Sequence, residues 1–288
     1  MQTYFECIPC FTRQALDALR QISDDEEFIL RVLRRVLKES AEFKMDLSPP
    51  EMAQTIHRII REESGDPDPY AAIKAHSNSV ALHLLDEART LVEGAIDPFQ
   101  MAVRFSIAGN IMDFALTAKI EDLDASLLIK KTLRQTLDDA AVNELRQAVQ
   151  RAETILILGD NAGEIVFDRL LVEQLGDAQV VYAVKGSPVI NDATRTDAHA
   201  AGMDRIAKII DTGNDAPGTL LDQCSAEFLA WFDLADLVIA KGQANYETLS
   251  EAHRSLFFLT QIKCPVIARD LEKPLQSWVV QHHQPNEK

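Results

Sequence analysis

The stretch that decides the fold of this chain is TILILGDNAGE, residues 154–164. An apolar run leads into a short polar turn, and the residues that follow it, IVFDRLL at 165–171, have helical spacing. This order predicts a buried strand, a tight turn and an amphipathic helix. Asp160 and Asn161 stand side by side in the turn, and their oxygens are ligands that Mg²⁺ and Mn²⁺ accept. The stretch therefore suggests a metal site of the kind used in phosphate chemistry.

Around this stretch, the second half of the chain alternates short apolar strands with helical segments. The alternation predicts a mainly parallel sheet with crossover helices, in which all strands end at one edge. Helices are expected near 164–175, 193–201 and 219–233, and the polar tail from Gln281 is expected to be frayed. The predicted strands are Thr154–Leu158, Val180–Val184, Ile206–Ile210, Leu237–Ala240, Leu256–Leu259 and Val266–Ala268.

The first half of the chain has apolar residues at helical spacing throughout. Ser48 and Glu51 form a capping-box pattern before one helix, and Asp97 precedes another. We expect a compact α-helical domain over residues 1–150 and an α/β domain over residues 151–288. The predicted helices of the first half are Cys7–Ile22, Asp25–Leu37, Pro49–Glu63, Ala71–Leu91, Pro98–Leu116 and Ala125–Leu133.

Composition limits the partners of the chain. Its 288 residues are 47% hydrophobic and carry a formal net charge of −16. The negative charge argues against a nucleic-acid partner, whose phosphates demand a basic face, and against an anionic membrane surface. It does not argue against a small anionic substrate, because one lysine and a metal can invert the charge of a single cleft.

Other sequence signals concern the compartment. No apolar run approaches the roughly 20 residues that span a bilayer, and the first residues lack the basic and apolar regions of a signal peptide. Four cysteines are too few for a disulfide scaffold in a chain of this size, so we expect a cytoplasmic protein. Cys7 and Cys10 form a lone CxxC at a helix start, which fits either two buried thiols or a minor metal or redox site.

Polar segments follow the first four predicted strands. Open α/β sheets bind their ligands at the carboxyl ends of parallel strands. Ordinary turn chemistry explains any one of these segments, since Gly, Asn, Asp and Pro are common in turns, but four at one edge favour a site. The four segments are residues 160–161, 185–192, 211–219 and 241–245.

Asp160 and Asp192 are separated by one strand–helix–strand unit. Their carboxylates could therefore meet across neighbouring strand ends and share a divalent cation, with Asn161 supplying a neutral carbonyl oxygen. Asp192 has an alternative role as the N-cap of the helix that begins near Ala193, unless Asn191 caps that helix instead.

Further candidates lie in the other segments. Lys241 directly follows a buried strand and suits an anionic ligand as a point charge, although it could equally extend to water. The backbone amides of Thr212 and Gly213 could cradle a phosphate. No P-loop and no dinucleotide-binding fingerprint accompanies them.

Asn110 and Asp113 share one face of an apolar helix in the first half. A buried Asp must be paired or lie near a metal, which makes the pair a candidate for the site. An exposed polar face or an interdomain hydrogen bond is the alternative.

Three motifs in this order resemble the damage-control phosphatase family, which is ARMT-like and was formerly a domain of unknown function, number eighty-nine. They are DNAGEIVFD at 160–168, GSPVINDAT at 186–194 and KGQANYET at 241–248. GNIMD at 109–113 resembles the family's helical-domain motif, and ECIPC at 6–10 resembles its prokaryotic, CxxC-bearing subgroup. The resemblance runs nearly end to end. It implies an N-terminal all-α helical domain packed on a C-terminal Rossmann-like three-layer α/β/α domain with a mainly parallel sheet.

The resemblance also implies a divalent metal (Mg, Mn, Co or Ni) in the cleft between the domains and hydrolysis of small phosphate monoesters, such as sugar phosphates or damaged phosphometabolites. The family's metal ligands correspond to Asp160, Asn161 and Asp192, and its lysine motif to Lys241 with Asn245 nearby. The family often has a second glycine after Gln243, where this chain has Ala244. That change matters only if the backbone there needs a positive φ.

We therefore expect a metal-dependent phosphatase that acts on a small phosphorylated metabolite. The metal would polarise the phosphoryl group and activate a water molecule, and Lys241 would neutralise charge on the phosphoryl oxygens. Glu164 either supports the ligands or only favours the start of its helix. The expected catalytic residues are Asp160, Lys241 and Asp113, and the expected substrate contacts are Asn110, Thr212, Gly213, Gln243 and Asn245.

Three alternatives stay open. Asp160 could attack the phosphoryl group covalently, although the aspartyl-phosphatase pattern of paired acids two residues apart is missing. The cleft could bind a phosphometabolite without turnover, in a sensor whose CxxC reports redox state or metal. A methyltransferase acting on carboxylates would need a donor motif, and none is visible. The sequence fixes neither the substrate nor the oligomeric state.

Overall fold

The computed structural model describes residues 1–109 and 125–285. It is an α/β protein built on a six-stranded sheet of order β3-β2-β1-β4-β5-β6. The first five strands pair in parallel and β6 pairs antiparallel with β5. The strands are β1 (Thr154–Leu158), β2 (Gln179–Val184), β3 (Lys208–Asp211), β4 (Leu237–Lys241), β5 (Leu256–Gln261) and β6 (Trp278–His283).

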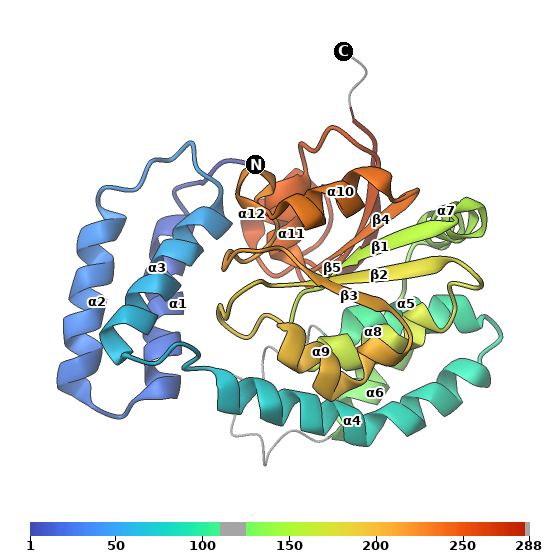
Figure 1. The fold of residues 1–288 in the computed structure, drawn as a ribbon, viewed down its shortest axis with the longest axis horizontal. Coiled ribbons are helices and arrows are strands. Elements are labelled where there is room, and N and C mark those ends of the chain that lie inside the picture. The colour runs from blue at the N-terminus through green and yellow to red at the C-terminus, as the bar shows by residue number, and fades with distance from the viewer. Residues whose placement is uncertain (110–124, 286–288) are drawn as a thin grey trace.

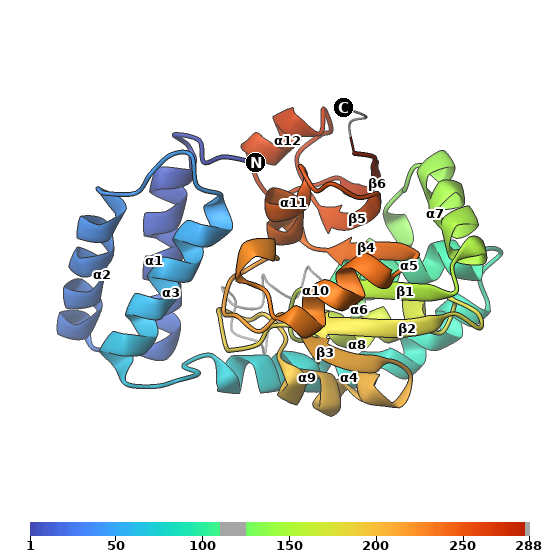
Figure 2. The same cartoon turned by 45° about the horizontal axis from the view of Figure 1, so that its top comes forward.

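Helices cover both faces of this sheet (Figures 1 and 2). Alternate residues of each strand point to opposite faces, so Ile155 and Ile157 of β1 enter one core while Leu156 and Leu158 enter the other. The first core is closed by α4 (Ala71–Glu93), α5 (Pro98–Ala108), α8 (Glu164–Val172) and α9 (Arg195–Ala201). The second core is closed by α10 (Ala226–Leu234), α11 (Gln243–Leu249) and α12 (Pro265–Asp270). Burial on both faces explains why the strands are apolar without interruption.

The last strand differs from the prediction. Val266–Ala268 was expected to be a strand and lies instead in α12, where the Cys264 thiol caps the helix by accepting from the Ile267 amide. The sixth strand is β6, which includes Gln281 from the segment expected to be frayed. A short apolar run after a proline does not distinguish strand from helix, and the pairing of β6 with β5 is a long-range contact that local periodicity does not contain.

The first three helices form a unit with its own hydrophobic core. They are α1 (Cys7–Ile22), α2 (Glu26–Ser40) and α3 (Pro49–Ser64), and we call them the α1–α3 unit. Phe11, Leu19, Val36 and Ile56 are buried in its core. The capping box predicted at Ser48 and Glu51 is present at the start of α3. Figure 1 shows the unit to one side of the sheet, with α4 running from it beneath the other helices.

The later helices of the first half pack on the sheet. Val103 of α5 and Leu145 of α7 (Asp139–Arg151) share the core that contains Ile155 of β1. Asp97 caps α5 as predicted, because its carboxylate accepts from the Gln100 amide at 3.0 Å. The remaining helix, α6, spans Ala125–Arg134. The domain boundary at residue 150 stays a prediction. Within the described residues, no helix combines the length and apolarity that crossing a membrane requires.

Candidate metal centre and active-site cleft

The turn after β1 and the loop after β2 are joined at the edge of the sheet. Asn161 and Asp192 form an antiparallel bridge. The Ala193 amide donates to the Asp160 carbonyl at 2.8 Å, and the Ala162 amide donates to the Asn191 carbonyl at 2.8 Å. The structure thus brings together the three residues expected to bind a metal, through backbone contacts that fix their spacing.

Asp192 does not cap a helix. The helix after it, α9, begins at Arg195 and is capped by a box between Thr194 and Asp197. The alternative in which Asp192 or Asn191 serves as the N-cap is therefore wrong. Asp192 is buried, and its carboxylate lies 3.5 Å from the ammonium of Lys185, the residue that directly follows β2.

The side chain of Asn161 is oriented by two acids. Its amide nitrogen donates to Asp160 Oδ2 at 2.8 Å and to Glu164 Oε2 at 3.3 Å. The carbonyl oxygen Oδ1 is therefore the end of the amide that would face a cation. Burial raises the pKa of the Glu164 carboxyl, the Lys241 ammonium opposes that increase, and the charge of Asp160 adds to it.

Lys241 lies beneath the predicted ligands, fully buried, and does not line the cleft described below. Its ammonium donates to Asp168 Oδ1 at 2.5 Å, to Glu164 Oε1 at 2.6 Å and to the Ser106 carbonyl at 2.9 Å. Burial lowers the pKa of Lys241, but the charges of Asp168 and Glu164 outweigh burial and raise it, so the residue stays protonated. Its three protons are committed inside the protein. The expected direct contact of Lys241 with substrate is therefore corrected to a supporting position.

Asp168 completes the buried polar group under the site. Besides the Lys241 ammonium, it accepts from the Ser106 hydroxyl at 2.5 Å and from the Tyr182 hydroxyl at 2.6 Å. Asp168 was not among the predicted site residues, although its position four residues after Glu164 places both acids on one helix face. Lys185 was not among them either, and it directly follows β2 in the chain, next to a strand end that carries a predicted ligand.

A glycine allows the turn after β4 to approach the first ligand. Gly242 has φ +80°, and a Cβ atom at this position would lie 1.9 Å from Asp160 Oδ2. The backbone of the KGQAN motif thus packs directly on the Asp160 carboxylate. Ala244, where the family often has glycine, lies inside α11 and not among the positive-φ positions, so this departure from the family pattern needs no special backbone.

The predicted ligands open into a cleft of about 660 Å³. One wall comes from the sheet edge and includes Asp160, Asn161 and Asp192. The opposite wall comes from the α1–α3 unit, with Cys10 and Phe11 of α1 and His57 of α3 among its residues. A cleft of this size, lined by apolar side chains with a few converging polar groups, is the usual form of a small-molecule site.

Three predicted substrate contacts do not reach this cleft. The Thr212 amide donates to the Val184 carbonyl at 2.9 Å, and the Gly213 amide donates to Asp211 Oδ1 at 3.0 Å. Both amides are therefore used within the protein and form no phosphate cradle here. Asn245 is fully buried and holds the Lys241 carbonyl at 2.7 Å. Gln243 does line the cleft, where it donates to Glu247 at 2.9 Å.

Asn110 and Asp113 lie outside the described residues. The residue before them, Gly109, packs against Glu164, because a Cβ atom on Gly109 would lie 2.7 Å from the Glu164 Cα. The helical-domain motif therefore begins next to the acid that orients Asn161.

The CxxC thiols are in the cleft with a third cysteine. Cys7, Cys10 and Cys264 all line it and all are free thiols. Burial raises the pKa of each of the three thiols, and their mutual charges add to the increase for Cys7 and Cys10. Across residues 1–109 and 125–285, no group of three or more His, Cys, Asp or Glu side chains is arranged to hold a metal ion.

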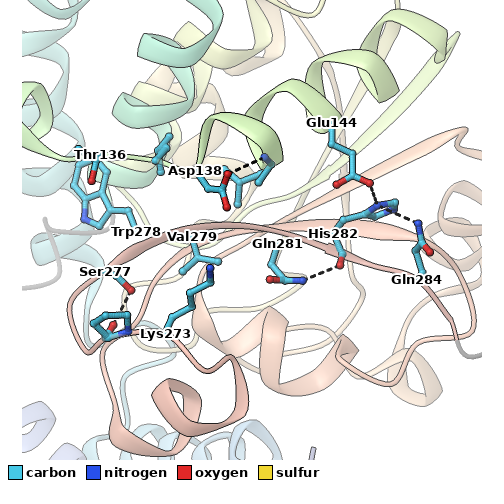
Figure 3. Close-up of a pocket in the computed structure, with 14 residues that line it drawn as sticks. Thr136, Asp138, Glu144, Lys273, Ser277, Trp278, Val279, Gln281, His282 and Gln284 are labelled. Atoms are coloured by element: carbon cyan, nitrogen blue, oxygen red, sulfur yellow. Dashed lines mark hydrogen bonds and ion pairs between the residues drawn. The ribbon is translucent and has the colours of Figure 1, made fainter.

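A second cavity, of about 590 Å³, lies between α7 and β6 (Figure 3). Two of its polar side chains are paired with each other, in the 2.6 Å contact between His282 Nδ1 and Glu144 Oε1. It shares no lining residue with the cleft and contains none of the motif residues. The cleft is therefore the better candidate for the functional site.

Comparison with known proteins agrees with the motifs. Residues 3–278 match the Damage-control phosphatase ARMT1-like domain. The chain belongs to this family. It is 35% identical to damage-control phosphatase PH1575 of Pyrococcus horikoshii over 95% of this chain and 96% of that protein. It is 34% identical to a damage-control phosphatase of Archaeoglobus fulgidus over 92% and 93% of the two chains.

The fold of the family is also shared. The crystal structure of a DUF89 family protein from Pyrococcus horikoshii superposes with a TM-score of 0.88 at 33% identity, covering 99% of this chain and 100% of that one. The resemblance inferred from the three motifs is therefore confirmed, and so is the predicted α/β fold with helices packed on a Rossmann-like sheet.

Proposed function

We propose that this protein is a metal-dependent phosphatase that hydrolyses small phosphate monoesters. The observation that carries the proposal is the bridge between Asn161 and Asp192, which sets two carboxylates and an amide in one wall of a cleft. The family relatives that cover nearly the same length are named damage-control phosphatases. Together these observations favour phosphatase chemistry in metabolite repair over the other activities that the sequence left open.

The donor set suits a divalent cation. Asp160, Asp192 and the Asn161 amide offer oxygen ligands of the type that Mg²⁺ and Mn²⁺ prefer, and Co²⁺ and Ni²⁺ also accept them. Buried ion pairs surround this donor set. The Lys185 ammonium lies 3.5 Å from Asp192, and the Lys241 ammonium donates to Glu164 and Asp168. A bound cation would supply Lewis acidity toward the phosphoryl oxygens.

The residues of the chain have distinct proposed roles around that cation. Asp160, Asn161 and Asp192 bind it. Glu164 orients the Asn161 amide, and Lys241 holds Glu164 in place while balancing its charge. We assign Lys241 to positioning and not to direct contact with phosphate, since all its protons have acceptors in the protein. Asn110 stays a proposed substrate contact and Asp113 a proposed catalytic residue, both from the N-terminal helical domain.

The proposed substrates are small phosphorylated metabolites, such as sugar phosphates or damaged phosphometabolites. The cleft volume of about 660 Å³ accommodates a ligand of this size, and Gln243 offers an amide to its hydroxyl groups. The α1–α3 unit forms the opposite wall and therefore contacts the alcohol leaving group of the ester.

The test is release of p-nitrophenol from p-nitrophenyl phosphate with Mg²⁺, Mn²⁺, Co²⁺ or Ni²⁺ and after chelation. We expect turnover that depends on the metal and is lost in Asp160→Asn. Asp233→Asn, an exposed acid outside the cleft, is the matched control and should keep full activity. Turnover that survives chelation or Asp160→Asn would refute the proposal. Binding of a phosphate ester with no turnover under any metal would favour the sensor instead.

A further inference from the structure

Helix α3 contacts the loop that carries Asp192. Arg61 donates from Nη1 to the Pro188 carbonyl at 2.6 Å, and its other terminal nitrogen pairs with the carboxylate of Asp215. Pro188 lies four residues before Asp192, in the loop after β2. The α1–α3 unit thus reaches across to the backbone that leads into a proposed metal ligand.

Asp215 is the second anchor of this contact. Its carboxylate accepts from Arg58 Nη2 at 2.6 Å and from Gln54 Nε2 at 2.9 Å, in addition to Arg61. Asp215 follows Asn214, whose carbonyl accepts from the Gly186 amide at 2.9 Å and the Ser187 amide at 3.2 Å. The loops after β2 and β3 are therefore tied together, and α3 holds both.

The loop held in this way contains a strained residue. Ile190 has φ +42°, a left-handed conformation that a β-branched side chain rarely adopts. Such a residue costs on the order of 1–3 kcal/mol and persists only where the surroundings enforce it. Ile190 sits between the Arg61 contact at Pro188 and the bridge at Asp192, and the Asp192 amide closes a turn across it by donating to the Val189 carbonyl at 3.0 Å.

The Arg61 contact is sheltered enough to act as an anchor. The side chains of Arg61 and Asp215 are 16% and 11% exposed, whereas those of Arg35 and Glu62, an ion pair inside the α1–α3 unit, are 43% and 61% exposed. Charge-assisted hydrogen bonds shielded from water hold a geometry more firmly than exposed pairs do.

We propose that Arg61 is a positioning residue for Asp192. By holding Pro188, it keeps the strained loop in the conformation that presents Asp192 beside Asp160 and Asn161. Packing of the α1–α3 unit against this loop and binding of the divalent cation therefore favour one another. The inference rests on the proposed metal centre. Because coupling between two events is reciprocal, the cation should in turn stabilise the packing of the α1–α3 unit against the loop.

The first test is the affinity for Mn²⁺ alone, measured by titration calorimetry. Arg61→Gln removes the charge and the paired donors, and we expect it to weaken Mn²⁺ binding about tenfold or more, as loss of a group that orients a metal ligand does. Arg35→Gln is the matched control and should bind Mn²⁺ as the wild type does. An Arg61→Gln affinity within twofold of the wild type would overturn the proposal.

A rescue experiment separates positioning from general damage to the fold. Ile190→Gly removes the backbone strain, because glycine adopts a positive φ without penalty. In the Arg61→Gln background we expect Ile190→Gly to restore much of the lost Mn²⁺ affinity. A double variant that binds no better than Arg61→Gln would show that the loop conformation is not what Arg61 controls.

A measurement without metal distinguishes failure of this inference from failure of the metal centre. Amide hydrogen exchange over residues 186–192 should be faster in Arg61→Gln than in the wild type or Arg35→Gln, while exchange in β5 stays unchanged. If the wild type binds no Mn²⁺ but this difference appears, the metal centre is wrong and the positioning of the loop stands. If exchange is unchanged, Arg61 does not position the loop, whatever the metal does.

Discussion

The two parts of the molecule that border the cleft contain ion pairs of similar length in opposite surroundings. Under the sheet edge, Lys241 lies 2.6 Å from Glu164, and both side chains are essentially inaccessible to water. In the α1–α3 unit, Arg35 lies 2.8 Å from Glu63, with side chains 43% and 24% exposed. Distance alone does not distinguish these pairs. The difference is burial. The buried Lys241–Glu164 pair fixes the shape of a site, whereas the exposed Arg35–Glu63 pair is a surface contact that can be replaced.

The sharpest test of this comparison is Lys241→Met. It leaves Glu164 and Asp168 buried without their cation, and removing one partner of a buried pair costs about 3–5 kcal/mol. We expect a loss of this size in the free energy of unfolding, measured by urea denaturation at pH 7.5. A loss below about 1 kcal/mol would mean that the buried pair behaves like a surface pair.

The next test concerns backbone contact with Asp160. Gly242→Ala would place a Cβ atom 1.9 Å from Asp160 Oδ2 at φ +80°, so the carboxylate must move. We expect p-nitrophenyl phosphate turnover to fall about 100-fold, as misplacement of a reacting group by about 1 Å does.

The matched glycine for this test is Gly176, which has φ +69° and open space around it. Gly176→Ala should cost about 1 kcal/mol of stability from its backbone conformation and leave turnover unchanged. Equal turnover in the Gly242 and Gly176 variants would contradict the close approach that the structure shows.

A third test uses pH on the α1–α3 side. Burial, aided by the charge of Arg61, lowers the pKa of His57 from 6.5 to about 3. As the pH falls below 6.5, the unfolded chain takes up a proton that the folded chain refuses, so stability is lost progressively down to about pH 3. This histidine should account for about 1.5 kcal/mol between pH 6.5 and pH 5.

The measurement is denaturant unfolding of the wild type and His57→Gln at pH 7, 6 and 5. The variant should lose less stability over this range than the wild type. His83→Gln, which replaces an exposed histidine of α4, is the control. If the free energy of unfolding falls equally with pH in the wild type and in both variants, His57 takes up its proton in the folded state.

The smallest effect is expected for the exposed pair itself. Arg35→Gln removes contacts to Glu62 and Glu63 on the surface of the α1–α3 unit, and such pairs contribute about 0–1 kcal/mol. Urea denaturation in low salt and in 1 M salt should show a small loss that salt removes. A loss comparable to that of Lys241→Met would remove the distinction between the buried pair and the exposed pair.

Sequence patterns predicted those parts of the molecule that local rules determine. The helices follow from periodicity and caps such as Ser48 and Asp97, and the parallel strands follow from apolar runs between helices. The meeting of the loops that carry Asp160 and Asp192 also followed, because parallel strands end at one edge.

The placement of side chains and strands by residues distant in the sequence could not be predicted. Lys241 was expected in the cleft, but whether a lysine after a strand faces a ligand or turns beneath it depends on Glu164, Asp168 and Ser106, which come from two other helices. The amides of Thr212 and Gly213 bind groups within the protein, and the pairing of β6 needs β5 as its template. Contacts of this kind leave no local periodicity in the chain.

The separate core of the α1–α3 unit has a consequence for how such proteins diversify. Phe11, Leu19 and Ile56 bury one another without help from the sheet, so amino-acid changes on the cleft side of α1 can accumulate while the chemistry-bearing edge stays as it is. Selection on substrate range can then act on one half of a binding surface at little risk to the other. The contacts that Gln54, Arg58 and Arg61 of α3 make with the loops after β2 and β3 restrict how far that half can change.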